Sequence, residues 1–326
     1  MDVMIYGATE DDPSVAMVAA ALRRRGVEPW VLDARGFPGE MRISFTADGA
    51  ASGSIDGRDL GTVGAVWVRH MEAGAALPEE MDPAHRQVCT QQAYAALWSL
   101  LDCIDAYVLD PPIPLLGSPR KPGMQRMAVR HGLTVPRSLI SNDADAVRRF
   151  AVGCPGGLIG KLIESGGVTL QDGAGTTSFP TFEITEDDLA TFEGLELSPM
   201  LFQEKVTKRR EIRLTVVGHR VFAASVEPGD VLDWRTDQDV VRSFRAFDAL
   251  PAAVERSVLA LMDELGLDYG TVDLIQTPDD RWVFLEVNSV SFFDHVERYA
   301  GLPIADAIAD LLLGVAPSRF PGRRRG

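Results

Sequence analysis

The sequence contains little cysteine, with three among its 326 residues. Cys89, Cys103 and Cys154 are too few for a disulfide framework, and their spacing matches no metal-binding motif. We therefore expect reduced, buried thiols, as is usual for proteins of the cytoplasm.

Long apolar runs are also missing. No uninterrupted run approaches the roughly 20 apolar residues that a membrane-spanning helix requires. The first residues, Met1–Gly7, lack the basic region and the apolar core of a signal peptide. These absences predict a cytoplasmic protein that does not associate with a membrane.

Positive charge is scarce as well. Lys and Arg number 32 against 47 Asp and Glu, which gives a formal net charge of −15. No basic surplus remains to neutralise phosphates, and this argues against nucleic acid or an anionic membrane as a partner. We interpret the local basic runs at residues 23–25, 208–210 and 323–325 as solvated faces.

The chain is long and apolar enough for about two or three folded domains, since 46% of its residues are hydrophobic. Its beginning predicts strand, helix and strand: Val3–Tyr6, then Val15–Arg25 capped by Ser14 and ended by Gly26, then Val27–Leu32. These elements form one right-handed βαβ unit. The absence of G-x-G-x-x-G after the first strand argues against a dinucleotide site there.

A strand at Val63–Val68 and a long helix at Arg86–Ile104 continue this first domain. The proline-rich segment Asp110–Pro114 must be an extended connector, because adjacent prolines exclude a helix. We place the first domain boundary there, which gives an N-terminal domain of residues 1–115.

After the connector, a helix at Lys121–Gly132, a second helix capped by Asn142 or Asp143, and a strand at Gly157–Ile163 predict a small α+β domain. Strands dominate from about residue 200 onward, apart from two helices. The predicted fold class is therefore α/β (α+β), with a central domain of residues 116–200 and a C-terminal, sheet-rich domain of residues 201–326. The two C-terminal helices are expected at Ala252–Leu265 and near Ile304–Leu313.

Two apolar runs near the C-terminus, residues 269–276 and 282–288, are typical of buried strands. Pro278–Arg281 between them is a predicted turn, so the runs should form a hairpin. If this four-residue loop closes the hairpin, Thr277 faces Trp282.

In that register Asp273 lies opposite Glu286, and Asn288 lies diagonal to Asp273 on the same face. Two buried carboxylates repel each other and are costly to desolvate unless a cation compensates them. Oxygen ligands alone suit Mg²⁺. We therefore predict a magnesium site at Asp273, Glu286 and Asn288; a wet strand end with ordinary surface acids is the alternative.

An aspartate followed across a hairpin by Glu-x-Asn resembles the metal site of ATP-grasp enzymes. Other segments resemble that family in the expected order. Lys121 resembles the first nucleotide-binding lysine, and Lys161, at a strand end before a glycine-rich turn, resembles the second. Gly166 and Gly167 fall in the corresponding phosphate loop. The resemblance implies an ATP-grasp fold and ATP with Mg²⁺ as cofactors.

Residues 200–206 resemble the hinge that holds adenine through backbone groups and ribose through an acid. Period-two alternation puts Glu211 and Arg213 on one polar face of the following strand. The resemblance therefore adds these cofactor-binding residues: Gln203, Glu204, Lys205, Val206 and Glu211.

Within the superfamily the chain most resembles the microviridin-type (graspetide) peptide cyclases, on the basis of Val66–Arg69 and Asp233–Arg235. Two features differ from that group. His70 stands where members usually carry a second arginine, and Ser289–His295 replaces a stretch with Pro and Gly-Gln-Trp. The resemblance implies a ribosomal precursor peptide, leader and core, as the partner; the sequence leaves the oligomeric state open and is compatible with a homodimer.

The implied chemistry transfers the γ-phosphoryl group of ATP to an Asp or Glu side chain, and a Ser, Thr or Lys side chain then attacks the acyl phosphate. Arg213 and Arg235 are the candidates for binding the substrate carboxylate, because a guanidinium fork matches its geometry. Lys121 and Lys161 would hold the phosphates.

Simpler interpretations stay open for these residues. The two lysines can be ordinary surface residues, Arg213 can form a structural cross-strand ion pair, and Trp234 and His295 can serve packing alone. Ser289 and Ser291 read as turn residues. For the whole protein, the alternatives are a ligase that adds an amino acid to a protein tail or small molecule, and an ATP-binding scaffold without chemistry.

Overall fold

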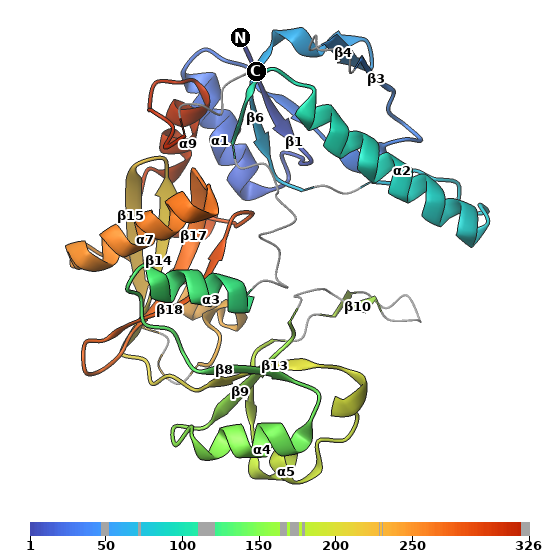
Figure 1. Ribbon diagram of the computed structural model, residues 1–326. Coiled ribbons are helices and arrows are strands. Elements are labelled where there is room, and N and C mark those ends of the chain that lie inside the picture. Colours follow the sequence, from blue (N-terminus) through green and yellow to red (C-terminus); the bar gives the residue numbers. More distant parts are fainter. Residues whose placement is uncertain are drawn as a thin grey trace.

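The computed structural model describes residues 1–46, 52–70, 73–109, 121–163, 168–169, 176–177, 180–227, 229 and 231–320. Within these residues the strands form three sheets of four or five strands and two smaller sheets. Figure 1 shows the N-terminal sheet at the top, the C-terminal sheet at the left and the sheet of the middle segment below.

The N-terminal sheet is parallel, in the order β2-β1-β6-β7. Helix α1 connects β1 to β2, which confirms the predicted βαβ unit. A small antiparallel sheet of β3, β4 and β5 and the long helix α2 follow; only the second half of α2 carries buried residues, and its first half extends away from the sheet (Figure 1). The elements are β1 (Asp2–Tyr6), α1 (Pro13–Arg24), β2 (Trp30–Leu32), β3 (Ile43–Thr46), β4 (Ser52–Ile55), β5 (Arg58–Asp59), β6 (Val63–Val68), α2 (Pro83–Asp102) and β7 (Tyr107–Leu109).

The start of α1 differs from the prediction. Asp12, not Ser14, caps the helix: its Oδ1 accepts hydrogen bonds from the backbone N–H groups of Ser14 at 2.8 Å and Val15 at 3.2 Å. The predicted cap was wrong because the helix already begins at Pro13, whose fixed φ and missing N–H suit the first helical position. Gly26 follows the helix with a φ of +78°, as expected for a helix stop.

The middle sheet is antiparallel, in the order β12-β9-β13-β8, with α4 and α5 packed on it. Asp143 caps α4, one of the two residues predicted to do so. The elements are β8 (Ser138–Ser141), α4 (Ala144–Val152), β9 (Leu158–Lys161), the hairpin β10 (Val168–Thr169) and β11 (Thr176–Thr177), β12 (Phe182–Ile184), α5 (Glu186–Thr191) and β13 (Met200–Glu204).

The two predicted domain boundaries compare differently with the structure. The boundary after residue 200 falls inside β13, which pairs with both β8 and β9 of the middle sheet. The boundary after residue 115, and the connector Asp110–Pro114, lie outside the described residues. The division into three domains stays a prediction.

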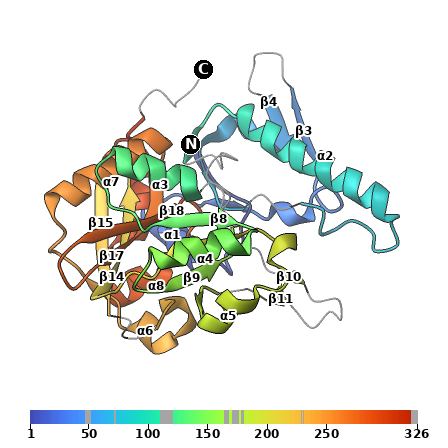
Figure 2. The ribbon, with the colours of Figure 1, turned by 60° about the horizontal axis from the view of Figure 1, so that its bottom comes forward.

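The C-terminal sheet is antiparallel, in the order β16-β15-β14-β17-β18. Helix α3 precedes the middle sheet in the sequence, yet it packs on β18 and α7 of the C-terminal sheet, as Figure 2 also shows. The elements are α3 (Lys121–Arg130), β14 (Arg210–Val217), β15 (Arg220–Val226), α6 (Gln238–Arg242), β16 (Arg245–Ala246), α7 (Ala252–Leu265), β17 (Tyr269–Gln276), β18 (Trp282–Asn288), α8 (Asp294–Ala300) and α9 (Ile304–Leu312).

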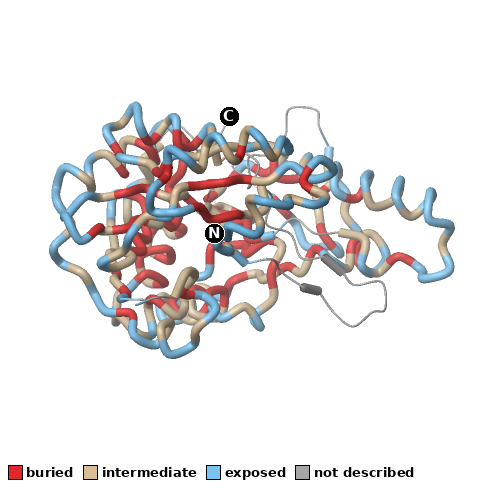
Figure 3. Tube along the Cα trace, turned by 90° about the horizontal axis from the view of Figure 1, so that it is seen from below, coloured by how far each residue is buried: buried red, intermediate tan, exposed pale blue. Residues whose placement is uncertain are grey.

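One hydrophobic core joins the N-terminal and C-terminal sheets. It contains Val3 and Ile5 of β1 and Trp67 of β6 together with Tyr269 of β17 and Phe293 before α8. The rings of Trp67 and Tyr269 meet edge to face at 6.3 Å. Figure 3 shows the buried stretches in red, mostly toward the inside of the trace, and the middle sheet has a separate core of its own. The two outer sheets therefore form one packed unit.

Among the described residues, no helix combines the length and apolar character needed to cross a lipid bilayer.

Candidate functional site

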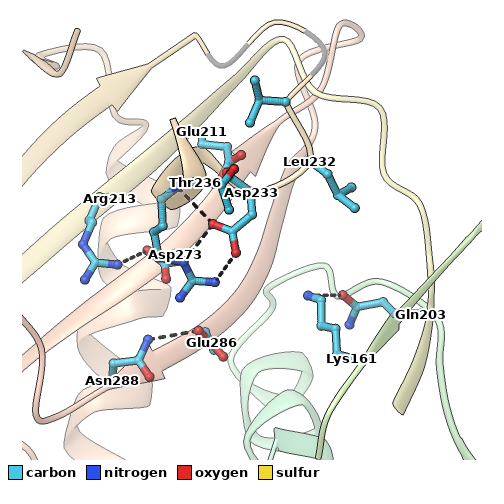
Figure 4. Close-up of polar contacts among 12 residues, drawn as sticks. Lys161, Gln203, Glu211, Arg213, Leu232, Asp233, Thr236, Asp273, Glu286 and Asn288 are labelled. Atoms are coloured by element: carbon cyan, nitrogen blue, oxygen red, sulfur yellow. Dashed lines mark hydrogen bonds and ion pairs between the residues drawn. The ribbon is translucent and has the colours of Figure 1, made fainter. Parts of the chain in front are cut away.

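A cavity lies where the middle sheet faces the C-terminal sheet. β9 and β13 supply one wall, and β14, β17 and β18 supply the other. Figure 4 shows Lys161 and Gln203 on one side and the carboxylates of Asp273 and Glu286 on the other. The charged residues lining the cavity are Lys121, Lys161, Glu204, Lys205, Lys208, Glu211, Asp233, Arg235, Asp273 and Glu286.

The β17–β18 hairpin places Asp273 directly opposite Glu286, which confirms that predicted pair. Between this pair and the turn the register differs, because Gln276 rather than Thr277 pairs with Trp282. The predicted Thr277–Trp282 pair was wrong, since the loop is one residue longer than expected. A bulge at Leu285 adds one residue to β18 and restores the register before the carboxylates.

The two carboxylates have polar partners within the protein. Arg213 donates from Nη1 to Oδ1 of Asp273 at 2.7 Å, and Asn288 donates from Nδ2 to Oε1 of Glu286 at 3.1 Å (Figure 4). Lys121 Nζ lies 3.5 Å from Glu286 Oε2. Two carboxylates and an amide oxygen from one hairpin, next to cationic side chains, are oxygen donors of the kind that fits Mg²⁺.

The cations around Glu286 keep it ionised. Burial works against the charged form, but Lys121, the hydrogen bond from Asn288, Lys161 and Arg235 outweigh it and hold the pKa of Glu286 below its usual value. A partly buried carboxylate that stays charged is ready to bind a cation at neutral pH.

Lys161, at the end of β9, points into the cavity. Its Nζ donates to Oε1 of Gln203 at 3.1 Å, and Gln203 in turn donates from Nε2 to Oγ of Ser138 at 3.0 Å. Burial lowers the pKa of Lys161, and the neighbouring charges of Lys121 and Arg235 act in the same direction while Glu286 opposes them. A desolvated ammonium with one neutral partner has donors left for an anion.

Glu211 pairs with Lys208, a residue that was not assigned to the site from the sequence. Lys208 Nζ lies 2.7 Å from Glu211 Oε1 and also donates to the backbone carbonyls of Val231 and Leu232, each at 2.9 Å. Burial raises the pKa of Glu211, partly offset by Lys208. The interpretation of residues 208–210 as a solvated face was wrong for Lys208, whose side chain is only 13% exposed. The pattern of charges in the sequence does not indicate the burial of Lys208, because only the folded chain turns this side chain toward the cavity.

Asp233, Trp234 and Arg235 form a short turn at the cavity edge. Both carboxylate oxygens of Asp233 accept from Arg235, at 2.8 Å from Nε and 2.7 Å from Nη2. Burial disfavours the Asp233 anion, but Arg235 and the distant Lys161 leave its pKa below the usual value. Trp234 is buried against Phe244, so packing accounts for much of its role. The fork of Arg235 is thereby oriented by a fixed carboxylate.

The structure thus brings most of the predicted site residues to one cavity. Arg213 and Asn288 lie beside it, through their contacts with Asp273 and Glu286. Gly166 and Gly167 lie outside the described residues. Among the described residues, no group of three or more His, Cys, Asp or Glu side chains is arranged to hold a metal ion, so the candidate metal site depends on the amide of Asn288 as its third donor. The predicted site residues that line the cavity are Lys121, Lys161, Gln203, Glu204, Lys205, Val206, Glu211, Arg235, Asp273 and Glu286.

The contacts of Arg213 and His295 were predicted only in part from the sequence. Arg213 forms a cross-strand ion pair, but with Asp273 of β17 rather than in the neighbourhood of Glu211. His295 packs against the rings of Trp234 and Phe244 at 5.3 and 5.6 Å, which favours the structural interpretation of this histidine. Ser291 is buried and hydrogen-bonded rather than exposed in a turn.

Comparison with known proteins places this geometry in context. Residues 2–113 match the family model described as the MvdD pre-ATP grasp domain. The macrocyclase MdnC from Microcystis aeruginosa MRC, solved with the precursor peptide MdnA, superposes with a TM-score of 0.86 at 31% identity, over 96% of this chain and 100% of that one. A RiPP-associated ATP-grasp ligase from Chryseobacterium gregarium, solved with ADP and a leader and core peptide, superposes with a TM-score of 0.88 at 27% identity, over 98% of each chain.

A curated relative matches over a shorter stretch. β-Citrylglutamate synthase B from Danio rerio is 30% identical over 130 residues, which are 38% of this chain. The chain spans only 31% of the length of that relative.

Proposed function

The chain belongs to the ATP-grasp ligases, among the macrocyclases of ribosomally made peptides, and from this premise we propose that it uses ATP to join side chains within a precursor peptide. The substrate side chains would be an Asp or Glu on one side and a Ser, Thr or Lys on the other. The products would be ester or amide crosslinks, ADP and phosphate.

The observation that carries this proposal is the meeting of cations and carboxylates around one cavity between two sheets. Lys121 and Lys161 approach from α3 and β9, while Asp273 and Glu286 approach from β17 and β18. A scaffold that only bound nucleotide would have no use for a second set of cations on the far side of the carboxylates, where Arg213 lies.

We assign the nucleotide to the wall made by the middle sheet. Lys121 and Lys161 would bind its phosphates, and residues 203–206 at the end of β13 would hold the base and ribose. Mg²⁺, held by Asp273, Glu286 and Asn288, would supply charge neutralisation of the phosphate oxygens. Arg213 and Arg235 would bind the substrate carboxylate and stabilise the charge on its phosphorylated form.

The reaction balances in two steps. A carboxylate oxygen of the peptide attacks the γ-phosphorus, ADP leaves, and an acyl phosphate forms. A hydroxyl or amine of the same peptide then attacks the acyl carbon, loses its proton, and phosphate leaves. Each crosslink therefore removes the elements of one water from the peptide and converts one ATP to ADP and phosphate.

Mass spectrometry of a short peptide encoded beside the gene, incubated with the protein, ATP and Mg²⁺, tests this function. We expect the loss of one water per crosslink, dependent on ATP. Asp273→Asn should abolish the mass change, while Asp279→Asn, in the exposed hairpin loop, serves as the matched control. Addition of an amino-acid mass instead would favour the amino-acid ligase, and ATP binding without turnover of an authentic precursor would contradict both enzyme assignments.

A further inference from the structure

Ser291 lies three residues beyond the candidate metal ligand Asn288, inside the stretch that differs from the peptide cyclases. It is buried, with 6% of its surface exposed. Its backbone carbonyl accepts two hydrogen bonds, from Arg69 Nη1 at 3.1 Å and from the hydroxyl of Tyr269 at 2.9 Å. Its side-chain Oγ accepts a third, from Nη2 of Arg213. One serine thus connects the N-terminal sheet to an arginine of the site.

Arg69, at the end of β6, is held rigidly on the other side of Ser291. Its side chain is fully buried and pairs with Asp12 Oδ2 at 2.9 Å. Its guanidinium carbon lies 4.9 Å from the ring centroid of Trp67 and 5.4 Å from that of Phe292. A buried guanidinium between two aromatic faces and a carboxylate has little freedom to move. Ser291 is therefore anchored to the N-terminal sheet.

The segment after Ser291 is anchored to the same sheet through α1. The hydroxyl of Ser14 accepts from the backbone N–H of Phe293 at 3.1 Å and of Asp294 at 3.3 Å. Asp12 contributes twice, because its Oδ1 caps α1 while its Oδ2 binds Arg69. The backbone around Ser291 is thus fixed from both sides.

Arg213 is the group that this anchor reaches. Nη1 donates to Asp273 and Nη2 to Ser291, and the guanidinium carbon lies 5.5 Å from the ring centroid of Trp234. Its Nε is buried and has no hydrogen-bond partner among the residues that the structure describes. A buried donor without a partner is costly, and a substrate oxyanion would supply that partner. The hydrogen bond to the hydroxyl of Ser291 fixes the rotation of the Arg213 guanidinium about its contact with Asp273.

We propose that Ser291 is a positioning residue for Arg213, and that Arg69 fixes Ser291 so that the N-terminal sheet sets the orientation of this guanidinium toward the substrate carboxylate. The inference rests on the proposed function, since it gives Arg213 its substrate. It also explains why the stretch that departs from the peptide cyclases can do so without losing the site: a serine hydroxyl and a buried arginine provide the support locally.

The two departures noted in the sequence meet at this anchor. The rings of His70 and Phe292 lie 6.5 Å apart, next to Arg69 and Ser291. His70 and the segment around Phe292 therefore belong to one structural feature, which lies next to the residues that hold Arg213 in place.

A double-mutant cycle on the full-length protein tests the proposal. With an authentic precursor peptide, Ser291→Ala should lower kcat by about 10- to 100-fold, because a misaligned fork costs rate more than binding. The KM for ATP should change by less than about twofold. Ser291→Thr, which keeps a hydroxyl, should recover part of the rate, and Arg69→Lys should lower kcat in the same manner as Ser291→Ala. In an Arg213→Ala background, Ser291→Ala should have no further effect.

Ser99→Ala, on the exposed face of α2, is the matched control and should leave kcat unchanged. An equal loss from Ser291→Ala in both backgrounds, or a rise in the KM for ATP at constant kcat, would overturn the positioning role. Crystal structures of the wild type and Ser291→Ala give a reading that does not need turnover: an unchanged Arg213 fork would overturn the inference even if no peptide were crosslinked. Absence of crosslinking by the wild type would instead count against the proposed function.

Discussion

Asp273 and Glu286 face each other across the β17–β18 hairpin because β18 contains one extra residue, Leu285, between Glu286 and the turn. Without the bulge, the pairing at the turn would put Leu285 opposite Asp273. Because side chains alternate between the two faces of a strand, a slip of one residue moves Glu286 to the opposite face. The bulge therefore brings the two acids together.

Glu286→Gln should remove one of the two facing carboxylates. We expect this variant to bind Mn²⁺, used as a paramagnetic probe for the Mg²⁺ site, at least about 100-fold more weakly, because a neutral amide is a poorer ligand for a hard cation than a carboxylate. Electron paramagnetic resonance measures the free ion, and circular dichroism checks the fold. Leu285→Met keeps both carboxylates, the register and the approximate volume, so it should retain metal binding. Tight Mn²⁺ binding by Glu286→Gln would disprove the assignment of Glu286 as a ligand.

Arg235→Lys should impair turnover more than nucleotide binding. The fork of Arg235 is set by two hydrogen bonds to Asp233, and a lysine cannot reproduce that geometry. We expect kcat for peptide crosslinking to fall by about 100-fold, with the affinity for ATP changed less than about threefold. The rate is read from the peptide mass spectrum and the affinity from calorimetry. Arg242→Lys, at an arginine of α6 that is equally exposed and pairs with Asp239, should have no effect.

The binding of ATP should weaken with rising pH because of Lys161. Its ammonium form binds phosphate, and burial lowers the pKa of this group in the folded protein. Lys161 therefore loses its charge at a lower pH than an ordinary lysine, whose pKa is roughly 10.4. Above the lowered pKa of Lys161, the affinity for ATP should fall by up to about tenfold per pH unit. Titration calorimetry between about pH 7 and about pH 10 measures this limb. Lys161→Arg should bind ATP without the limb, since a guanidinium stays charged.

The same shift has an opposite consequence for stability without ATP. Between the lowered native pKa and roughly 10.4, the unfolded chain binds the proton of Lys161 more strongly than the folded chain does. The free energy of unfolding should therefore rise with pH across that window. A fall across the same window in the wild type, absent from Lys161→Met, would contradict the burial of this lysine.

Trp67→Ala should destabilise the N-terminal and C-terminal sheets together. Trp67 is 1% exposed and contacts Tyr269 across the shared core, so its truncation should cost about 3–5 kcal/mol. Urea denaturation should show one transition for both sheets, moved to lower urea. Val88→Ala, on the exposed half of α2, should change the free energy of unfolding by less than about 0.5 kcal/mol. Two separate transitions would contradict the common core.

Local signals predicted the elements well where a single segment decides them. The strand Val63–Val68 and the helix Ala252–Leu265 have the predicted bounds, because apolar runs and stop signals such as Gly266 act within a few residues. The cap of α1 was wrong because Ser14 and Asp12 both suit a helix start. The choice depended on Pro13 and on the N–H groups of Phe293 and Asp294, which occupy the serine hydroxyl.

The site shows the same division. The hairpin with Asp273, Glu286 and Asn288 could be predicted from spacing, and the family resemblance added the lysines and the nucleotide wall. Neither predicted the bulge at Leu285, because a bulge depends on how two strands pair rather than on either strand alone.

The sequence by itself therefore determined which residue types carry the chemistry, in which order, and on which strands and helices they sit. Only the tertiary structure decided which of them meet. Lys208 turns inward to Glu211, and α3 packs on the C-terminal sheet rather than on the middle sheet. Ser291 contacts both Arg213 and Arg69, although Arg69 lies 222 positions earlier in the sequence. These contacts follow from long-range packing of apolar surface, whose partners no local pattern encodes.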